Sequence, residues 1–156
     1  MKKVMSKIFL IPILGIFLIN FNVDLIYAKN NYPSFENITC KIYFKDKTSV
    51  DLLLDIADTE EKRSFGLMHR KYMDSNAGML FVWEESEIRN FWMANTFLDL
   101  DLFFLNAKGI VIDIHKKAKA MDKTNIQSKE KAKLVLELQT GKLNAALGDK
   151  LICPIL

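Results

Sequence analysis

The chain has 156 residues, with 22 basic and 19 acidic side chains and a net charge of +3 at neutral pH. Residues 1–28 hold three lysines and one aspartate, so the remaining 128 residues carry 19 basic and 18 acidic side chains, a net charge of only +1. This balance gives no support for a nucleic-acid partner, which calls for a basic patch or stripe, and we expect none. It leaves enough chain for one compact domain and too little for two of ordinary size.

The N-terminus has the pattern of a secretory signal peptide. Lys2, Lys3 and Lys7 precede an apolar run at 8–21, and "IYA" ends at Ala28, a candidate cleavage point. The run has 14 residues, fewer than the roughly 18 needed for a membrane span, although an uncleaved N-terminal anchor stays an alternative. We expect residues 1–28 to direct export to the periplasm or cell envelope. Membrane contact is expected only through this leader, if it is retained.

A polar linker at 29–38 precedes two predicted strands. "TCKIYFKD" has the apolar–polar alternation of a strand, "KDKT" is a turn and "SVDLLLDIA" is a second strand, which together predict a hairpin. Cys40 lies in the first of these strands and Cys153 in the last apolar segment, "LICPIL". In a small exported sheet protein the first and last strands are often neighbours. The two cysteines therefore either form a disulfide or remain separate apolar thiols.

A short helix is expected in "DTEEKRSFGLMHRKYM", beginning at Asp58 or Thr59. Both residue types cap helix N-termini, and the two glutamates that follow suit the positive end of a helix. Apolar side chains then recur at spacings of three and four up to residue 72, which predicts one apolar face. Gly66 weakens the middle of this helix.

The rest of the chain alternates strand and turn signals about every ten residues. Strands are predicted at 79–85, 90–96, 98–105, 110–120, 132–141 and 149–156, with a turn at 106–109, a polar surface excursion at 120–131 and a helical turn at 142–147. The prediction for residues 39–156 is a single α+β domain with one or two short helices. Its sheet is expected to be mainly antiparallel, with a small barrel as one arrangement.

Strong catalytic and metal-binding motifs are absent from the sequence. It has no Gly-rich phosphate loop, paired-histidine helix, Cys-pair zinc site or serine nucleophile elbow. His69 and His115 are far apart in the sequence, and we interpret them as surface or hydrogen-bonded histidines. Methionine sulfur can bind copper(I), but core packing beside aromatic rings is the favoured reading for Met68, Met73, Met79 and Met93. We expect no metal and no cofactor.

Arginine is rare, with three residues (Arg63, Arg70 and Arg89) against 19 lysines. Its planar guanidinium suits recognition of carboxylate or phosphate better than a lysine does. Arg63 and Arg70 are seven residues apart and would share a face if the helix continued through Gly66. Surface ion pairs with nearby glutamates are the structural alternative.

The segment "RNFWMANTFLDLD" holds the other candidate site residues. On a strand, Trp92 and Thr96 would face one side and Asn95 the other. Asn95 and Thr96 can offer hydrogen bonds to a ligand, or they can tie off a turn. Asp101 lies between two leucines. Facing inward, it would be a buried carboxylate in need of a partner such as an arginine, and facing outward it would be solvated.

Several ordered blocks resemble the Domain of Unknown Function 192 family of bacteria and archaea. They are "R..GLM.R" at 63–70, "GMLF" at 78–81, "FWM.NT" at 91–96, "LD" at 100–101, "VLEL..G" at 135–141 and "GD" at 148–149. The resemblance covers residues 40–152 and implies a compact mixed α/β domain, often exported, with no known reaction. The chain departs from the family pattern at Ala94, usually Lys, and at Asp99, usually Pro. A ligand role that rests on a lysine at position 94 is therefore not available.

From these observations we expect a monomeric, non-enzymatic module that binds a polar or anionic small molecule such as a sugar or a peptide terminus. The candidate site residues are Arg63, Arg70, Trp92, Asn95, Thr96 and Asp101. One alternative is a hydrolase-type enzyme with Asp101 as acid/base and Arg63 as electrostatic stabiliser. It requires Asp101 to reach a concave pocket that contains an arginine. Another is a protein-interaction domain whose strands add to a partner's sheet.

Overall fold

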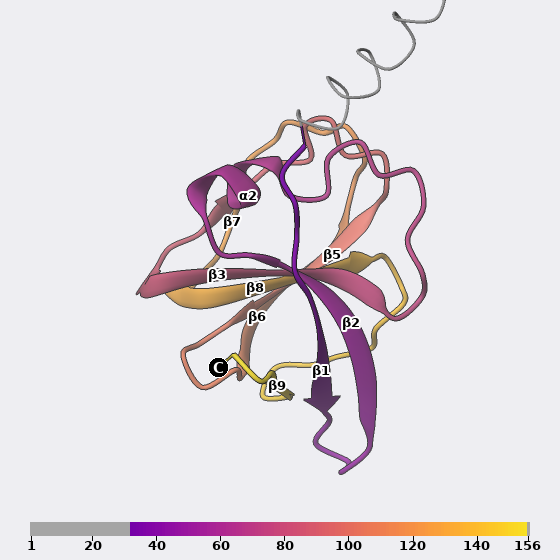
Figure 1. The fold of residues 1–156 in the computed structure, drawn as a ribbon. Coiled ribbons are helices and arrows are strands. Elements are labelled where there is room, and N and C mark those ends of the chain that lie inside the picture. The colour runs from indigo at the N-terminus through magenta and orange to yellow at the C-terminus, as the bar shows by residue number, and fades with distance from the viewer. Residues whose placement is uncertain (1–31, 156) are drawn as a thin grey trace, which may run out of the picture. The chain divides into compact units, whose positions relative to one another are not determined.

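The computed structural model describes residues 32–155, which are drawn in colour in Figure 1. From Pro33 onward they form one compact unit. The leader expected at 1–28 lies outside the described residues. Within residues 32–155, no helix combines the length and the apolar character needed to cross a membrane.

In this part of the chain, seven strands form one curved sheet that curls into a half-barrel (Figure 1). Their order is β6-β5-β8-β3-β2-β1-β9. The bounds are β1 (Asn37–Tyr43), β2 (Ser49–Ala57), β3 (Ala77–Glu87), β5 (Leu100–Leu105), β6 (Val111–Ala118), β8 (Ala132–Gln139) and β9 (Lys150–Ile152). Two short strands, β4 (Asn90–Phe91) and β7 (Ile126–Gln127), pair separately as a second sheet.

The predicted α+β class is corrected to a mainly β fold, whereas the sheet is mainly antiparallel as expected and is mixed because it contains one parallel pair. β2 and β3 run parallel, because the chain between them crosses over through the helix α2 (Glu60–Phe65). The other neighbouring pairs are antiparallel. The predicted hairpins β1–β2 and β5–β6 are both present.

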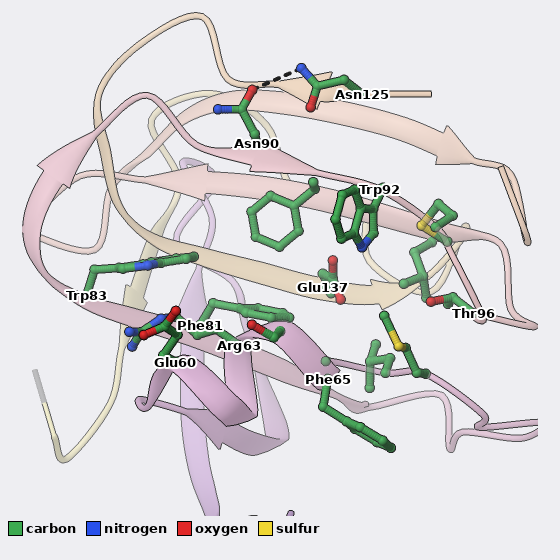
Figure 2. Close-up of a pocket in the computed structure, with 17 residues that line it drawn as sticks. Glu60, Arg63, Phe65, Phe81, Trp83, Asn90, Trp92, Thr96, Asn125 and Glu137 are labelled. Atoms are coloured by element: carbon green, nitrogen blue, oxygen red, sulfur yellow. Dashed lines mark hydrogen bonds between the residues drawn. The ribbon is translucent and has the colours of Figure 1, made fainter. Parts of the chain in front are cut away.

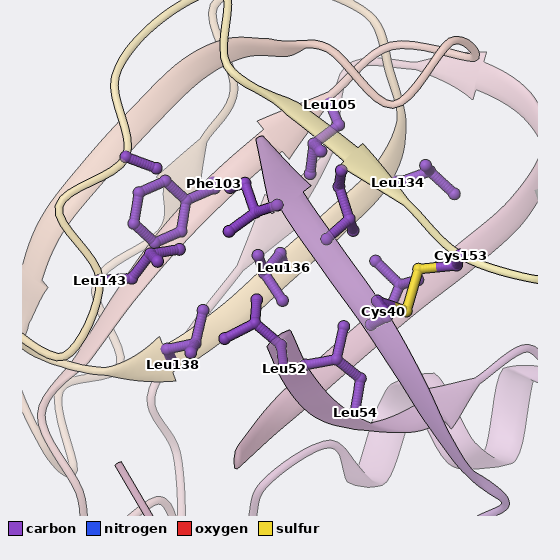
Figure 3. Packing of buried hydrophobic residues seen from close by; sticks show 14 of the residues in the cluster. Cys40, Leu52, Leu54, Phe103, Leu105, Leu134, Leu136, Leu138, Leu143 and Cys153 are labelled. Carbon is purple, nitrogen blue, oxygen red and sulfur yellow. A yellow bond between two sulfur atoms is a disulfide. The ribbon is translucent and has the colours of Figure 1, made fainter. Parts of the chain in front are cut away.

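The two edges of the curved sheet approach each other at β6 and β9. Leu151 N–H donates to the Gly109 carbonyl oxygen at 2.8 Å, and Val111 N–H donates to the Asp149 carbonyl oxygen at 2.9 Å. A Cβ on Gly109 would lie 2.2 Å from the Leu151 carbonyl oxygen, so this approach needs glycine. A disulfide joins Cys40 of β1 to Cys153, directly after β9 (Figure 3).

Two apolar clusters lie on opposite faces of the sheet because strand side chains alternate. The inner cluster fills the concave side and includes the side chains in Figure 3, such as Leu54, Phe103 and Leu136. The outer cluster lies on the other face and includes Met79, Phe81 and Leu102. The segments that join the strands, including α2, cover the outer cluster (Figure 1).

The helix α2 is shorter than the sequence predicted. It begins as expected, with Thr59 as N-cap accepting a hydrogen bond from Lys62 N–H at 3.2 Å. It ends at Gly66, which has φ 53° and whose N–H donates to the Lys62 carbonyl oxygen. Arg70 therefore lies beyond the helix and does not share a helical face with Arg63. The helical turn expected at 142–147 is also absent from this part of the chain.

The strand predicted at 90–96 is confined to the two residues of β4. Beyond Phe91 the chain runs as turn and loop, and Asn95 adopts φ 56°. The left-handed backbone at Asn95 interrupts the alternation that the sequence pattern had predicted. This irregular path folds residues 92–96 over the outer cluster.

Candidate functional site

A pocket of about 420 Å³ lies between the outer face of the sheet and the segments that cover it (Figure 2). Strands β3, β5 and β8 supply its floor, while α2 with the residues after it and the 90–96 segment supply its walls. Its lining residues are Glu60, Arg63, Ser64, Phe65, Gly66, Leu67, Met68, Phe81, Trp83, Asn90, Phe91, Trp92, Met93, Thr96, Leu100, Asn125 and Glu137.

The floor carries a buried carboxyl group, that of Glu137. Alternation along β8 sends Leu136 and Leu138 into the inner cluster and Glu137 to the opposite face. Its cross-strand neighbours are Met79 of β3 and Leu102 of β5, both fully buried. Glu137 is only 4% exposed, and in Figure 2 its carboxyl group points into the space between Trp92 and Phe81.

The Glu137 side chain has no hydrogen-bonding or ion-pair partner among the residues that the structure describes. Burial raises the pKa of Glu137 from 4.5 to about 8, and no cationic side chain in the described chain counters this effect. At neutral pH the group is therefore mostly protonated, and it can both donate and accept a hydrogen bond in the pocket.

Aromatic rings form much of the wall above Glu137. Phe81 and Phe91 meet edge to face, with ring centroids 5.1 Å apart, and Trp83 lies 6.1 Å from Phe81 and 6.2 Å from Phe91. Gly66 allows α2 to end close to this group, because a Cβ there would lie 3.3 Å from the Phe81 ring. Trp92 stands at the rim and is 62% exposed. These rings make the interior around the Glu137 carboxyl group largely apolar.

Polar side chains line the pocket at its edges. Asn125 donates from Nδ2 to Oδ1 of Asn90 at 2.9 Å, a contact that ties β4 to the 119–127 segment (Figure 2). On the α2 side, the Arg63 guanidinium donates to the carbonyl oxygens of Asp58 and Val82. Its Cζ lies 5.3 Å from the centroid of Trp83. Arg63 is thus held against β3 and Trp83.

Three of the six predicted site residues line this pocket. Arg63 and Trp92 do so from opposite walls, and the buried Thr96 contributes from the loop after β4. The Thr96 hydroxyl donates to the Ala94 carbonyl oxygen at 3.3 Å, a local loop contact. The sequence thus singled out three residues that line the pocket.

The other three predicted residues lie elsewhere. Arg70 forms an ion pair with Asp55 and lies over the Phe35 ring. Asn95 is exposed and its Nδ2 contacts the Met68 sulfur at 3.9 Å. Neither Arg70 nor Asn95 lines the pocket. Each is accounted for by contacts that hold the covering segments in place.

Asp101 also lies outside the pocket, on the opposite face of β5, and it has several partners. Its carboxylate accepts hydrogen bonds from the N–H groups of Lys117 at 2.9 Å and Gly141 at 3.1 Å, and it pairs with Lys116 at 3.4 Å. Burial pushes the pKa of Asp101 upward, but these hydrogen bonds and the lysine charge outweigh burial and leave the pKa below its ordinary value. The geometry required for an Asp101–Arg63 catalytic pair is therefore not met.

The methionines divide between the pocket and the core. Met68 and Met93 line the pocket, and Met73, Met79 and Met93 are buried in the outer cluster. Within residues 32–155, no three His, Cys, Asp or Glu side chains gather closely enough to hold a metal ion.

Glu137 is the pocket residue that reasoning from sequence missed. It appeared only as one letter of the "VLEL..G" block in a predicted strand. Period-two alternation places it with Lys133, Val135 and Gln139 on one face of β8, and such a face usually meets water. Two features could have indicated that this face is buried: the apolar Val135 beside Glu137, and a central position of the strand in the sheet.

Comparison with known proteins places this architecture in a family. The family model described as "Uncharacterized ACR, COG1430" (DUF192) matches residues 42–151. A crystal structure from Sinorhizobium meliloti, of a protein provisionally described as a transcription regulator, superposes with a TM-score of 0.78 and 31% identity. The match covers 81% of this chain and 100% of that one.

A protein of unknown function from Novosphingobium aromaticivorans shares the fold. Its crystal structure superposes with a TM-score of 0.71 and 24% identity, covering 80% of this chain and 95% of the other. No curated protein sequence matches the chain. The family match runs from Ile42 in β1 to Leu151 in β9 and includes α2 and every segment that lines the pocket, and the chain belongs to the Domain of Unknown Function 192 family.

Proposed function

We propose that the protein is a non-enzymatic module of the cell envelope that binds a small molecule in the pocket above Glu137. The ligand would carry an apolar or ring-shaped body, which contacts Phe81, Phe91 and Trp92, and a polar group that reaches the carboxyl of Glu137. The observation that carries the proposal is this carboxyl, buried and without a partner at the floor of an aromatic cavity.

The size and chemistry of the pocket support a small-molecule ligand. Its volume of about 420 Å³ falls in the range of known ligand sites, which are mostly apolar with a few polar groups that fix orientation. An unpartnered buried carboxyl costs free energy in the unliganded protein. A ligand that satisfies it recovers that free energy on binding. These properties narrow the expected ligand from polar or anionic molecules in general to a largely apolar molecule with a localised polar group.

Glu137 is also the strongest remaining candidate for a catalytic residue, if the protein is an enzyme. A buried glutamic acid that titrates near neutral pH could serve as a general acid or base. Catalysis would also need a reacting partner, and the pocket offers Glu60 and Ser64. Within the described chain, neither side chain is hydrogen-bonded to Glu137. Binding without chemistry is therefore the function we favour.

Two features support a location in the envelope. The first is the basic and apolar leader at 1–28, which has the pattern of an export signal. The second is the pairing of both cysteines in one disulfide, a feature of proteins in oxidising compartments. Fractionation of cells that express the full chain tests the location, and recovery of the protein with cytosolic markers would contradict it.

A fragment screen tests the binding function directly. The full chain would be titrated with ring-bearing fragments at millimolar concentration, and the indole N–H resonances of Trp83 and Trp92 would report binding by NMR. We expect saturable shifts that weaken in Trp92→Ala. They should persist in Tyr72→Ala, a matched exposed aromatic outside the pocket that is 77% exposed. Absence of saturable binding by every fragment overturns the proposal.

A further inference from the structure

We propose that the pocket selects an organic cation, a protonated amine on an aromatic or aliphatic body, and that Glu137 is the anion that pairs with it. This inference rests on the proposed binding function and specifies its ligand class. It follows from three properties of the described chain: the partners of the buried carboxylates, the occupancy of the aromatic faces, and the position of the pocket's arginine.

Glu137 differs from the other buried carboxyl groups. Asp55, Asp101 and Asp113 are each paired with a cationic side chain: Arg70, Lys116 and Lys129 respectively. Asp149 accepts hydrogen bonds from the N–H groups of Lys45 and Ala146. Among the buried carboxyls of residues 32–155, Glu137 alone has no such partner. A buried carboxyl needs a partner in order to ionise, and we expect the cation that allows Glu137 to ionise to arrive with the ligand.

Three rings of the aromatic wall carry no cationic side chain from the described residues. Trp83 is already occupied, because Arg63 and Arg89 lie 5.3 and 4.2 Å from its ring centroid. Phe81, Phe91 and Trp92 line the same pocket, and within the described chain no lysine or arginine lies over their rings. Aromatic faces attract ammonium groups, most strongly when water is excluded. These three rings can therefore hold the ammonium against Glu137.

Arg63 does not take the place of the ligand cation. Its guanidinium is held by the carbonyl oxygens of Asp58 and Val82 and lies against Trp83. Burial is the single cause of the raised Glu137 pKa, so the Arg63 charge does not act on it appreciably. Besides Glu137, the charged side chains that line the pocket are Arg63 and Glu60, both on α2.

Protonation couples to binding in a defined way. At pH 7 the carboxyl of Glu137 is mostly protonated, and a primary amine in water is mostly ammonium. Forming the ammonium–carboxylate pair therefore transfers the Glu137 proton to the buffer, with close to one proton released per ligand bound. The affinity for an amine then rises by roughly tenfold from pH 6 to 7 and by roughly fivefold from pH 7 to 8, because the ionised form of Glu137 becomes more populated. The affinity for a neutral ligand does not rise.

Three probes of similar size separate the ligand classes. Phenethylamine is a cation, phenylethanol is neutral and phenylacetate is an anion, and all share one phenyl ring. Each would be titrated into the full chain at pH 7 by NMR, with calorimetry of phenethylamine in phosphate and in Tris to count released protons. We expect phenethylamine to bind more tightly than phenylethanol, by about tenfold at least. Phenylacetate should bind most weakly. Glu137→Gln should reduce phenethylamine affinity to that of phenylethanol.

The outcomes distinguish this inference from the proposed binding function. Equal affinity of wild-type protein for phenethylamine and phenylethanol, with both weakened by Trp92→Ala, overturns cation selection and leaves the binding function intact. Absence of binding by all three probes and by every ring fragment overturns both. If Glu137→Gln does not fold, the pH series on wild-type protein decides the matter. A phenethylamine affinity that does not change between pH 6 and 8 overturns the pairing with Glu137.

Discussion

Glu137 of β8 lies directly opposite Met79 of β3, and both side chains occupy the covered outer face of the sheet. A carboxyl beside a fully buried thioether loses much of its hydration, and no side chain of the described residues pairs with it in exchange. The pKa of Glu137 accordingly rises to about 8 in the folded protein from 4.5. Between these values the folded state holds a proton that the unfolded chain has released. Stability therefore falls as pH rises through this window.

Urea unfolding of the unliganded protein at pH 5, 6, 7 and 8 measures this loss. We expect the free energy of unfolding to fall across the series by an amount on the order of a few kcal/mol that is attributable to Glu137. Glu137→Gln cannot ionise and should lose this component of the slope. Glu84→Gln, at an exposed position of the adjacent strand, should keep it. Parallel pH profiles for wild type and Glu137→Gln would contradict the assignment.

Asp101 is expected to act on stability and not on ligand binding. Its carboxylate joins the backbone of Lys117, which has φ 59°, to the backbone of Gly141. The β5–β6 register shifts between Leu100 and Leu102, so Asp101 fastens a bulge between the two strands. Asp101→Asn should lower the free energy of unfolding at pH 7 by about 1–3 kcal/mol. Phenethylamine affinity should change less than about twofold.

The matched control for this prediction is Asp51→Asn, which removes a solvent-exposed ion pair with Lys41. It should cost at most about 1 kcal/mol. Because the folded pKa of Asp101 is lowered, its contribution is present above the unfolded value of 3.8 and is lost as pH falls below it. Loss of ligand binding in Asp101→Asn without loss of stability would contradict this prediction and show that Asp101 takes part in ligand binding.

Local features of the fold could be read from the sequence because short-range chemistry determines them. The β1–β2 and β5–β6 hairpins follow from alternation around turn residues, and Thr59 caps α2 as its residue type predicts. The parallel pairing of β2 with β3 could not be read in the same way. It depends on how a short helix and a 66–76 loop return the chain across the sheet, and no local sequence pattern specifies that path.

Only half of the predicted site residues line the pocket, for a similar reason. Trp92, Thr96 and Arg63 lie in segments whose composition is unusual in itself. Glu137 lies in an ordinary strand pattern, and its burial arises from covering segments that are distant in the sequence. Asp101 was ambiguous because the face of β5 to which it belongs depends on register, and a register shift beside it supplies its partners. Long-range packing thus decides that Glu137 lies in the pocket and Asp101 does not.

Gly78 and Gly141 offer a comparison of two different requirements for glycine. A Cβ at Gly78 would lie 2.4 Å from the Glu137 carbonyl oxygen, so Gly78→Ala forces β3 and β8 apart beneath the pocket. Gly141 has φ +79° but no atom within 4 Å of an added Cβ. Urea or thermal unfolding should show that Gly141→Ala lowers the free energy of unfolding by about 1–2 kcal/mol, from backbone strain alone. Gly78→Ala should lower the free energy of unfolding by more than Gly141→Ala does, and it should also weaken phenethylamine binding. Equal losses would show that β3 and β8 tolerate the added methyl group.

The disulfide between Cys40 and Cys153 should stabilise the protein by restricting the unfolded chain. It closes a loop with a sequence separation of 113 residues and joins β1 to the residue after β9. For a loop of this length the chain-entropy argument gives about 4–5 kcal/mol. The double variant Cys40→Ala/Cys153→Ala should therefore have a free energy of unfolding lower by about 2–5 kcal/mol.

The same loss of stability should be seen when wild-type protein is unfolded in the presence of a reductant. Wild-type protein denatured without a reductant should contain no titratable thiol. Two titratable thiols per chain, or equal stability of the double variant and the wild type, would refute this stabilising role.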